Sequence, residues 1–233
     1  MPRIIDLTIP LASGIGHPMF RKVQVAPYHV HEIHRRSNAD LSLAIHTATH
    51  VDAPYHFFAG GTTIDRLSLD LLIGEGVLFR VEGVAQAGHR FTVTDLKAGT
   101  KGNGPDLKGK IAVVATGWSN CAFSDEPRYF RDSPTLSPDA AKWLAEAEVK
   151  AVVLDSATDA ADPAPVEEQA CPIHRTFLSH SIPIIENCID LVKIPEGYPF
   201  TLYAIPLKIR GESGAPARIF ALIEDCEKKG GIP

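Results

Sequence analysis

The chain has few of the features that mark several large classes of protein. Its 233 residues include only four cysteines, which lie far apart and form no Cys-x-x-Cys pair. Neither a thiolate zinc site nor a disulfide framework is therefore expected. No apolar run approaches the roughly 18 residues that a membrane-spanning helix needs, and the N-terminal segment lacks a cleavage site of the signal-peptide kind. These absences favour a protein of the reducing cytoplasm.

A strong charge of either sign is also missing. The 23 lysines and arginines against 28 aspartates and glutamates give a formal net charge of −5, and no basic cluster reverses it. That balance argues against a nucleic-acid partner. The chain shows no repeat and no linker, and its length suits one substantial core. We expect residues 1–233 to form a single domain.

One stretch is, by contrast, dense in histidine. The segment LSLAIHTATHVDAPYHF, residues 41–57, places His46, His50, Asp52 and His56 within eleven positions. Imidazole nitrogens and carboxylate oxygens are ligands of zinc and its first-row neighbours. All four residues have even numbers, so on a strand they would share one face. The set predicts a metal site, although any one of these histidines alone would more often be structural.

The spacing also constrains the backbone. On an extended chain, His50 and Asp52 would lie about 6–7 Å apart at Cα, but His46 and His50 would lie about 13 Å apart, too far to share an ion. A helix would bring His46 close to His50 but would then meet Pro54. We therefore expect a strand that ends near Ile45, followed by a tight loop that carries the ligands.

The second half of the chain has the pattern of an α/β fold. Ile111–Ala115 and Ala151–Leu154 are apolar runs typical of buried strands. A helix beginning at Ser137-Pro138-Asp139 lies between them, which indicates a right-handed parallel βαβ unit. Phe200–Pro206 and Ala217–Ile223 add further strands. We predict an α/β domain with a mixed β-sheet core and flanking helices.

Two further residues draw attention as a pair. Glu186 follows the apolar run Ile182–Ile185, at the carboxyl end of an expected strand, where α/β folds place their chemistry. A carboxylate there needs a partner such as a metal, an arginine or a helix N-terminus. His174 precedes it in an expected helical segment. Either residue alone would more often be a surface or packed side chain.

The segment HTATHVDAPYH resembles the HxGTHxDxPxH signature of the metal-dependent cyclase family, which includes bacterial kynurenine formamidases and isatin hydrolase-like enzymes. Ile5–Thr8 is similar to the opening strand of that family, Thr116–Trp118 to its TGW segment, and His174–Asn187 to its later ligand region. The resemblance implies a swivelling β/β/α-like architecture and a homo-oligomer, either a dimer or a tetramer. It also implies hydrolysis of a small amide, formamide, cyclic imide or lactone.

The resemblance assigns a role to each candidate residue. Five of them would bind one or two divalent ions, zinc or manganese: His46, His50, Asp52, His174 and Glu186. Asp52 would bridge the two ions in dinuclear members. His56 would be the catalytic acid/base, a role suited to a pKa near neutrality.

This sequence departs from the family pattern in three places. Ala48 replaces the glycine of the signature, which matters if that position needs a positive φ. The opening loop reads GIGHPMF instead of a Trp-Pro-Gly-rich segment. Residues 154–162, LDSATDAAD, differ from the Asp-Thr-Pro-Ser pattern of the formamidases. The last two segments border the substrate pocket in relatives, so the resemblance leaves the substrate open.

Two other functions fit part of the pattern. His50-x-Asp52 with a distant His174 is similar to the 2-His-1-carboxylate triad of non-haem Fe(II) oxygenases, but the additional His46 argues against it. A non-catalytic metal-binding protein would close its site with four protein ligands and would need no neighbouring base. His56 argues against that function.

Overall fold

The computed structural model describes residues 2–18, 20–100, 105–123, 126–159 and 170–224. The strands of its main sheet are β1 (Arg3–Asp6), β4 (His50–Asp52), β5 (Ile73–Arg80), β7 (Ile111–Ala115), β9 (Ala151–Leu154), β10 (Ile184–Glu186), β11 (Phe200–Pro206) and β12 (Gly214–Ile223). They form an eight-stranded sheet in the order β1-β12-β11-β5-β7-β9-β10-β4. The β5-β7-β9-β10 portion is parallel and the remaining pairings are antiparallel. The predicted mixed α/β class is confirmed.

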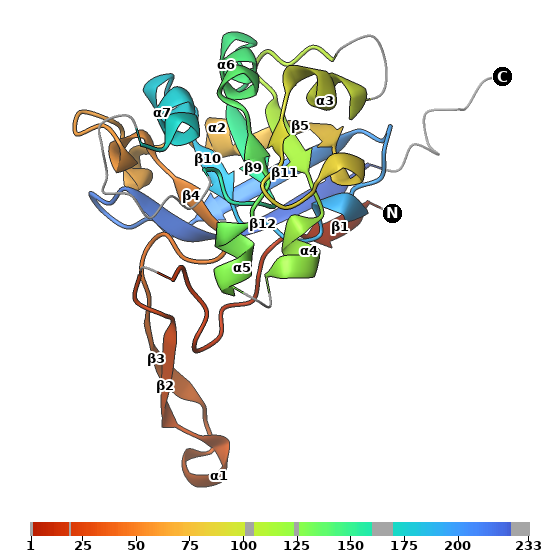
Figure 1. Ribbon diagram of the computed structural model, residues 1–233. Helices are drawn as coiled ribbons and strands as arrows, with labels where there is room; N and C mark the ends of the chain where they lie inside the picture. Colours follow the sequence, from red (N-terminus) through yellow and green to blue (C-terminus); the bar gives the residue numbers. More distant parts are fainter. Residues whose placement is uncertain (1, 19, 101–104, 124–125, 160–169, 225–233) are drawn as a thin grey trace, which may run out of the picture.

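Two short pairings lie outside the main sheet, β2 (Gln24–His29) with β3 (Asn38–Ser42) and β6 (Arg90–Phe91) with β8 (Thr135–Leu136). The α-helices are α1 (His31–His34), α2 (Leu69–Leu72), α3 (Val93–Ala98), α4 (Trp118–Ala122), α5 (Glu126–Arg131), α6 (Pro138–Glu146) and α7 (Pro172–Ser179). Figure 1 shows α3, α6 and α7 on one side of the main sheet and α4 and α5 on the other. Within the described ranges, every helix is too short or too polar to cross a bilayer.

The main sheet closes into a barrel-like ring because β12 is long enough to pair with several strands. Its first residues, 214–216, pair with β4, whereas residues 217–223 pair with β11 and the last four of these also pair with β1. The other edge of β4 pairs with β10, which completes the ring. The closure brings β4, β10 and the start of β12 side by side. These strands are distant from one another in the sequence.

We predicted that a loop after Ile45 would carry the ligands. That prediction is wrong for His50–Asp52, which form strand β4. All three residues are buried, and both edges of the strand are paired. A strand of three residues has no periodic pattern of its own, and its partners come from the other end of the chain. The local sequence therefore could not reveal it. His50 and Asp52 nevertheless share one face, as their even spacing predicted.

Several other predicted elements agree with the structure. Strands β7, β9 and β11 match the predicted segments residue for residue, and β7 and β9 are parallel neighbours. Helix α6 begins at Pro138, and the Ser137 hydroxyl accepts a hydrogen bond from the N–H of Ala140. The predicted capping serine and the proline at the first helical position are thus both confirmed.

The parallel strands face two apolar cores. Ile111, Val113 and Ala115 of β7 point into the ring, where they join buried residues of β4, β9, β11 and β12. Ala112 and Val114 point outward and pack beneath α3, α6 and α7. Because both faces of β7 are covered, its sequence is continuously apolar instead of alternating. The two cores hold the strands that carry the candidate site.

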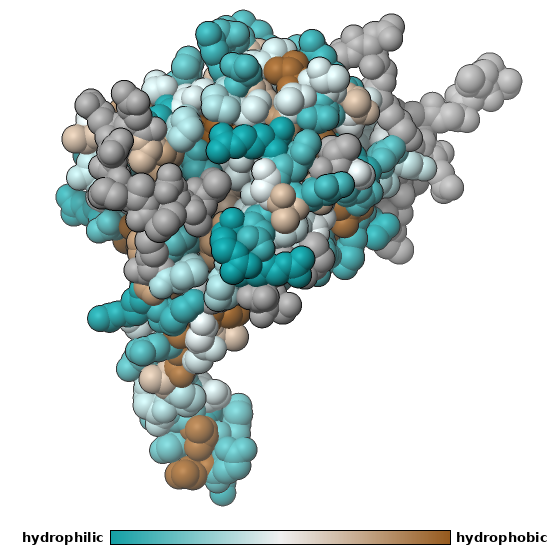
Figure 2. Space-filling view, viewed as in Figure 1, coloured by the Kyte–Doolittle hydropathy of each residue, from teal (hydrophilic) through white to brown (hydrophobic). Residues whose placement is uncertain are grey.

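One part of the molecule stands apart from these cores. Strands β2 and β3 form a hairpin with α1 at its tip, which projects away from the body (Figure 1). We call residues 24–42 the arm. None of them is buried, and Val25, Tyr28, Ile33 and Leu41 are exposed apolar residues. Figure 2 shows hydrophobic surface along the arm and at its far end.

Candidate metal centre

Asp52 of β4 lies at the centre of the candidate residues and is completely buried. Its Oδ1 lies 2.6 Å from Nδ1 of His46 and 3.1 Å from Nε2 of His50. Its Oδ2 lies 3.4 Å from Nε2 of His174, a residue of α7, and has no hydrogen-bond partner among the residues that the structure describes. Buried polar atoms rarely stay unpaired. An orphaned carboxylate oxygen that faces an imidazole nitrogen is what a cation site would provide.

Glu186 reaches the same point from the neighbouring strand. The register of β10 against β4 sets Glu186 directly opposite His50. Glu186 Oε2 lies 3.5 Å from Nε2 of His50, and Oε1 lies 3.6 Å from Nε2 of His174. Oε1 also accepts a hydrogen bond of 2.9 Å from the N–H of Thr158. Each of the two carboxylates thus lies within 3.6 Å of the same two imidazole nitrogens.

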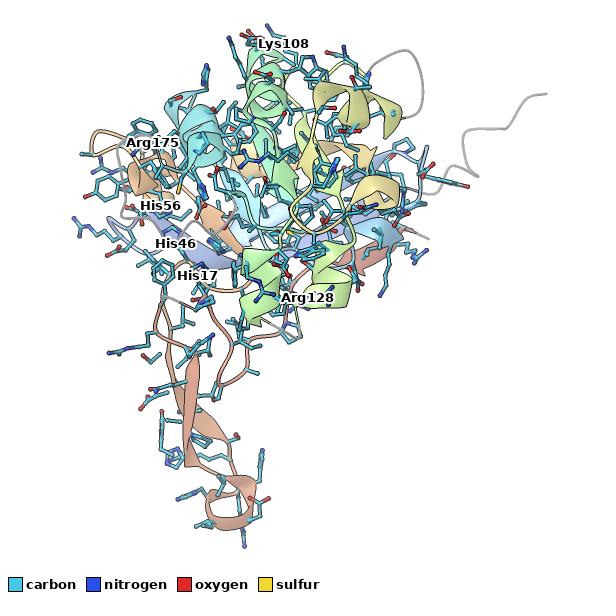
Figure 3. All side chains as sticks on the ribbon, in the orientation of Figure 1. His17, His46, His56, Lys108, Arg128 and Arg175 are labelled. Atoms are coloured by element: carbon cyan, nitrogen blue, oxygen red, sulfur yellow. The ribbon has the colours of Figure 1, made fainter. Side chains whose placement is uncertain are left out.

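The two remaining histidines complete the group. His56 lies in the 3₁₀ turn Pro54–His56, and its ring stacks on that of His46 with centroids 3.9 Å apart. Its centroid lies 5.8 Å from that of His174. His46 Nε2 lies 2.9 Å from the hydroxyl oxygen of Ser213. In Figure 3 the labelled His46 and His56 lie together below α7. The structure therefore brings all six predicted residues into one cluster.

The backbone holds His50 in place. Its Nδ1 lies 2.8 Å from the carbonyl oxygen of Ala48, which leaves Nε2 directed at the two carboxylates. Ala48 has a φ of 51°, a left-handed conformation that costs a residue with a Cβ roughly 1–2 kcal/mol. The position where the family signature has glycine therefore does need a positive φ, and this chain tolerates alanine there.

The charged groups of the cluster shift one another's pKa values. Burial would raise the pKa of Asp52, but His50 and His46 hold it well below its usual value. Burial likewise opposes a charge on His50, yet Asp52 and Glu186 raise its pKa to about 9. Burial also opposes a charge on His174, whose pKa is held well above the usual range by Asp159 and Asp52. Without a metal, protons on the imidazoles balance the carboxylates.

His56 differs from its neighbours. Burial, together with the nearby His46, His174 and His50, lowers its pKa to about 4, against an opposing effect of Asp52. The sequence suggested a pKa near neutrality, and the difference arises because the ring is packed between aromatic and imidazole side chains. His56 is therefore an uncharged imidazole at neutral pH, with a nitrogen available to accept a proton.

The donor set fits a divalent cation. Atoms bound to one tetrahedral ion at ~2.0–2.2 Å lie about 3.4 Å from one another. The four contacts between imidazole nitrogens and carboxylate oxygens at His50, Asp52, His174 and Glu186 measure 3.1, 3.4, 3.5 and 3.6 Å. His46, Asp52 and His56 also offer ligand atoms that lie within 4.8 Å of one another. Imidazole nitrogens and carboxylate oxygens in this number suit zinc and its first-row neighbours.

A comparison with known families agrees with this donor set. The family model described as "Putative cyclase" matches residues 5–160. The chain belongs to this cyclase family. The match includes His46, His50, Asp52 and His56, and the resemblance found in the sequence is confirmed.

Known proteins similar to this one cover most of the chain. A protein named kynurenine formamidase from Salinibacter ruber is 30% identical over 190 residues, covering 80% of this chain and 79% of the relative. Another of that name from Erythrobacter litoralis is 29% identical over 187 residues, covering 80% and 77%. The crystal structure of an isatin hydrolase bound to the product analogue thioisatinate has the same fold, with a TM-score of 0.84, 24% identity, and coverage of 96% and 93%. A structure described as a potential metal-dependent hydrolase with cyclase activity has a TM-score of 0.74 and 26% identity, and covers 97% and 100%.

Three further residues that support the site were not identified from the sequence. Ser213 contacts His46, and Asp159 Oδ2 lies 2.7 Å from Nδ1 of His174. Gly214 lies so close to His46 that a Cβ built there would be 2.6 Å from the His46 ring. The one available signal in the sequence was for Asp159, which lies in a segment that departs from the family pattern. The contacts of Ser213 and Gly214 depend on the closure of the sheet, and that of Asp159 depends on the position of α7.

Proposed function

We propose that the protein is a metal-dependent hydrolase that cleaves the C–N bond of a small amide, formamide or cyclic imide, or the ester bond of a lactone. The proposal depends on one observation, the convergence of His50, Asp52, His174 and Glu186 at ligand spacing beside the uncharged imidazole of His56. The relatives named kynurenine formamidase support the same class of reaction. The altered opening loop and the altered segment 154–162 leave N-formylkynurenine as one candidate among several.

The proposed cofactor is zinc or manganese, with one or two ions per chain, since imidazole and carboxylate suit both metals. The proposed ligands of the first ion are His46, His50 and Asp52. His174 and Glu186 would hold the second ion, with Asp52 shared. A divalent ion bound there lowers the pKa of water to about 7 and polarises a carbonyl group as a Lewis acid.

His56 would transfer the proton. As an uncharged imidazole it can accept a proton from the attacking water and return it to the leaving nitrogen. The stacked ring of His46, at 3.9 Å, and the edge-on ring of Phe57, at 4.7 Å, fix the plane of the imidazole. The ring is thereby oriented before substrate arrives, which is how positioning lowers a barrier.

Metal analysis combined with turnover tests this function. Protein purified without added metal is analysed for zinc and manganese and then assayed against formamides, isatin-like cyclic amides and lactones. We expect His56→Ala to keep its metal and to lose roughly 10²–10⁴-fold in turnover, the usual contribution of a general acid/base. His180→Ala is the matched control, because His180 is an exposed histidine whose Nδ1 lies 2.8 Å from the carbonyl oxygen of Thr176.

Each alternative function predicts a different result. Full turnover in His56→Ala would remove His56 as the acid/base. Oxygen consumption with an organic substrate would indicate the Fe(II) oxygenase instead. Stable metal binding without hydrolysis of any substrate class would favour a non-catalytic metal-binding protein. Absence of metal even after zinc and manganese are added would contradict the hydrolase.

We also propose that the protein is a homo-oligomer, either a dimer or a tetramer, that acts on a small-molecule substrate. The arm supports this, because isolated two-stranded hairpins are marginally stable in water, and this one exposes Val25, Tyr28, Ile33 and Leu41. A second copy of the chain that covers the arm would bury these residues. Light scattering after chromatography should give a multiple of the 25.2 kDa chain mass, and replacing Ile33 and Leu41 by Asp should reduce it. A monomer would contradict the proposal.

We propose further that residues 1–233 are a single domain with the swivelling β/β/α-like architecture of the cyclase family. The closed mixed sheet, with helices on two sides, supports this assignment (Figure 1). A single cooperative unfolding transition, with calorimetric and van't Hoff enthalpies that agree, is the expected result for one domain.

A further inference from the structure

The N-terminus of α7 lacks a cap of its own. The residue at the N-cap position, Cys171, makes no side-chain capping hydrogen bond, and Pro172 occupies the first helical position. The N–H groups of Ile173 and His174 still need acceptors, as do all first-turn donors of a helix. Both donate to the carboxylate of Asp159, at 3.1 Å each. Asp159 thus caps the helix from a different part of the chain.

The same carboxylate also contacts the ring of His174, with its Oδ2 2.7 Å from Nδ1. A carboxylate offers only acceptors, so the hydrogen in this contact must belong to the imidazole. When His174 is uncharged, as a metal ligand must be, Nε2 is then the nitrogen without a hydrogen. It lies 3.4 Å from Oδ2 of Asp52 and 3.6 Å from Oε1 of Glu186. Asp159 therefore sets both the tautomer of His174 and the direction in which its lone pair points.

We propose that Asp159 is a positioning residue: by holding the helix end and the Nδ1 hydrogen together, it presents Nε2 of His174 to the second metal ion. The proposal depends on the proposed function, because His174 is a ligand only if the site binds a metal. Carboxylates that orient ligand histidines in this way change metal affinity by about 10–100-fold when removed. Asp159 lies in the segment 154–162 that departs from the formamidase pattern.

A competing explanation is direct ligation. Asp159, Cys171 and His174 offer ligand atoms within 4.8 Å of one another, so a metal could bind among them. The Nδ1 hydrogen would then be displaced and Cys171 would become a ligand. The two explanations give opposite predictions for Cys171, which has no part in orienting His174.

The decisive variant is Asp159→Asn, which keeps the size of the side chain and one carbonyl oxygen but loses the charge and an acceptor. Metal-free protein is titrated with Zn²⁺ and with Co²⁺, whose absorption spectrum reports the ligand environment. We expect Asp159→Asn to bind the ion that uses His174 about 10–100-fold more weakly, with a changed Co²⁺ spectrum. Its unfolding temperature without metal should fall, because one acceptor of the α7 cap is lost. Far-ultraviolet circular dichroism at the titration temperature should still match the wild type, which separates lost orientation from lost folding.

Two controls make the result specific. Asp139→Asn removes an exposed acid from the first turn of α6 that has no imidazole partner, and it should leave both affinities unchanged. Cys171→Ser should also bind like the wild type, and a loss equal to that of Asp159→Asn would overturn the proposal in favour of direct ligation. Wild-type affinity and spectrum in Asp159→Asn would overturn it as well. If the wild type binds no metal, the proposed function itself fails, a result distinct from either of these.

Discussion

The two sides of the candidate metal centre orient an imidazole in the same way but with different groups. On the strand side, Nδ1 of His50 lies 2.8 Å from the carbonyl oxygen of Ala48. On the helix side, Nδ1 of His174 lies 2.7 Å from the carboxylate of Asp159. The strand side is thus fixed by backbone that the closed sheet holds in place, whereas the helix side depends on one replaceable side chain. The orientation of His50 should therefore be rigid, whereas the orientation of His174 should change when Asp159 is replaced.

The largest effect is expected where the two sides meet, at Asp52. Its Oδ1 faces the strand side and its Oδ2 faces the helix side, so Asp52→Asn removes charge from both. We expect a loss of metal affinity beyond the roughly 100-fold upper range of supporting residues, with turnover falling in parallel. Metal analysis after dialysis measures this, with Asp40→Asn in the exposed arm as control. Retention of one full ion would show that the two sides are independent.

Gly214→Ala should damage the strand side alone. A Cβ at this position would lie 2.6 Å from the His46 ring and 2.7 Å from the carbonyl oxygen of Val51, both far inside contact distance. The clash should displace His46 and loosen the β12–β4 pairing, and misplacement of about 1 Å can cost 10²-fold in turnover. Gly60→Ala is the control, because no atom of the described part of the chain lies within 4 Å of a Cβ there. An equal loss in both variants would point to general destabilisation instead.

The difference between the two sides also explains what the sequence could predict. The eleven residues from His46 to His56 identified the strand-side ligands because their spacing is local, and the apolar run before Glu186 predicted a strand by the same kind of local pattern. Asp159 and Gly214 escaped notice because each acts on a histidine distant in sequence, through the sheet closure and the position of α7. The pKa of His56 could not be anticipated either, since it depends on burial. Local patterns therefore indicated which residues form the site, while their supports required the fold.

Metal binding should release protons from the imidazoles on both sides of the site. The pKa of His50 is raised to about 9, and that of His174 is held well above its usual value. At neutral pH both imidazoles are then protonated without metal, and an ion must displace those protons. Apparent affinity should rise with pH up to about 9, by about tenfold per unit for each displaced proton. Calorimetric titrations in buffers of different ionisation enthalpy measure the release, and a pH-independent affinity between 7 and 9 would contradict it.

The smallest effect is expected for Ala48→Gly, which tests whether the strand side is strained. Glycine relieves the strain of the positive φ, which should raise the free energy of unfolding by roughly 1–2 kcal/mol. The greater freedom of unfolded glycine costs about 0.5–1 kcal/mol, and loss of a buried methyl about 0.8 kcal/mol. The net change should therefore stay within about 1 kcal/mol, or roughly 2–4 °C in Tm.

Ala53→Gly supplies the comparison that isolates the strain. Ala53 is also buried, but its φ is −96°, so its replacement loses the methyl group and chain entropy without relieving any backbone strain. Thermal unfolding of the metal-free variants should place Ala48→Gly above Ala53→Gly by about 1–2 kcal/mol, the cost of a left-handed residue. Equal destabilisation would mean that position 48 is unstrained. The expected difference would show that the chain holds the Ala48 carbonyl against His50 at a cost to its backbone, whereas His174 is held by the side-chain carboxylate of Asp159.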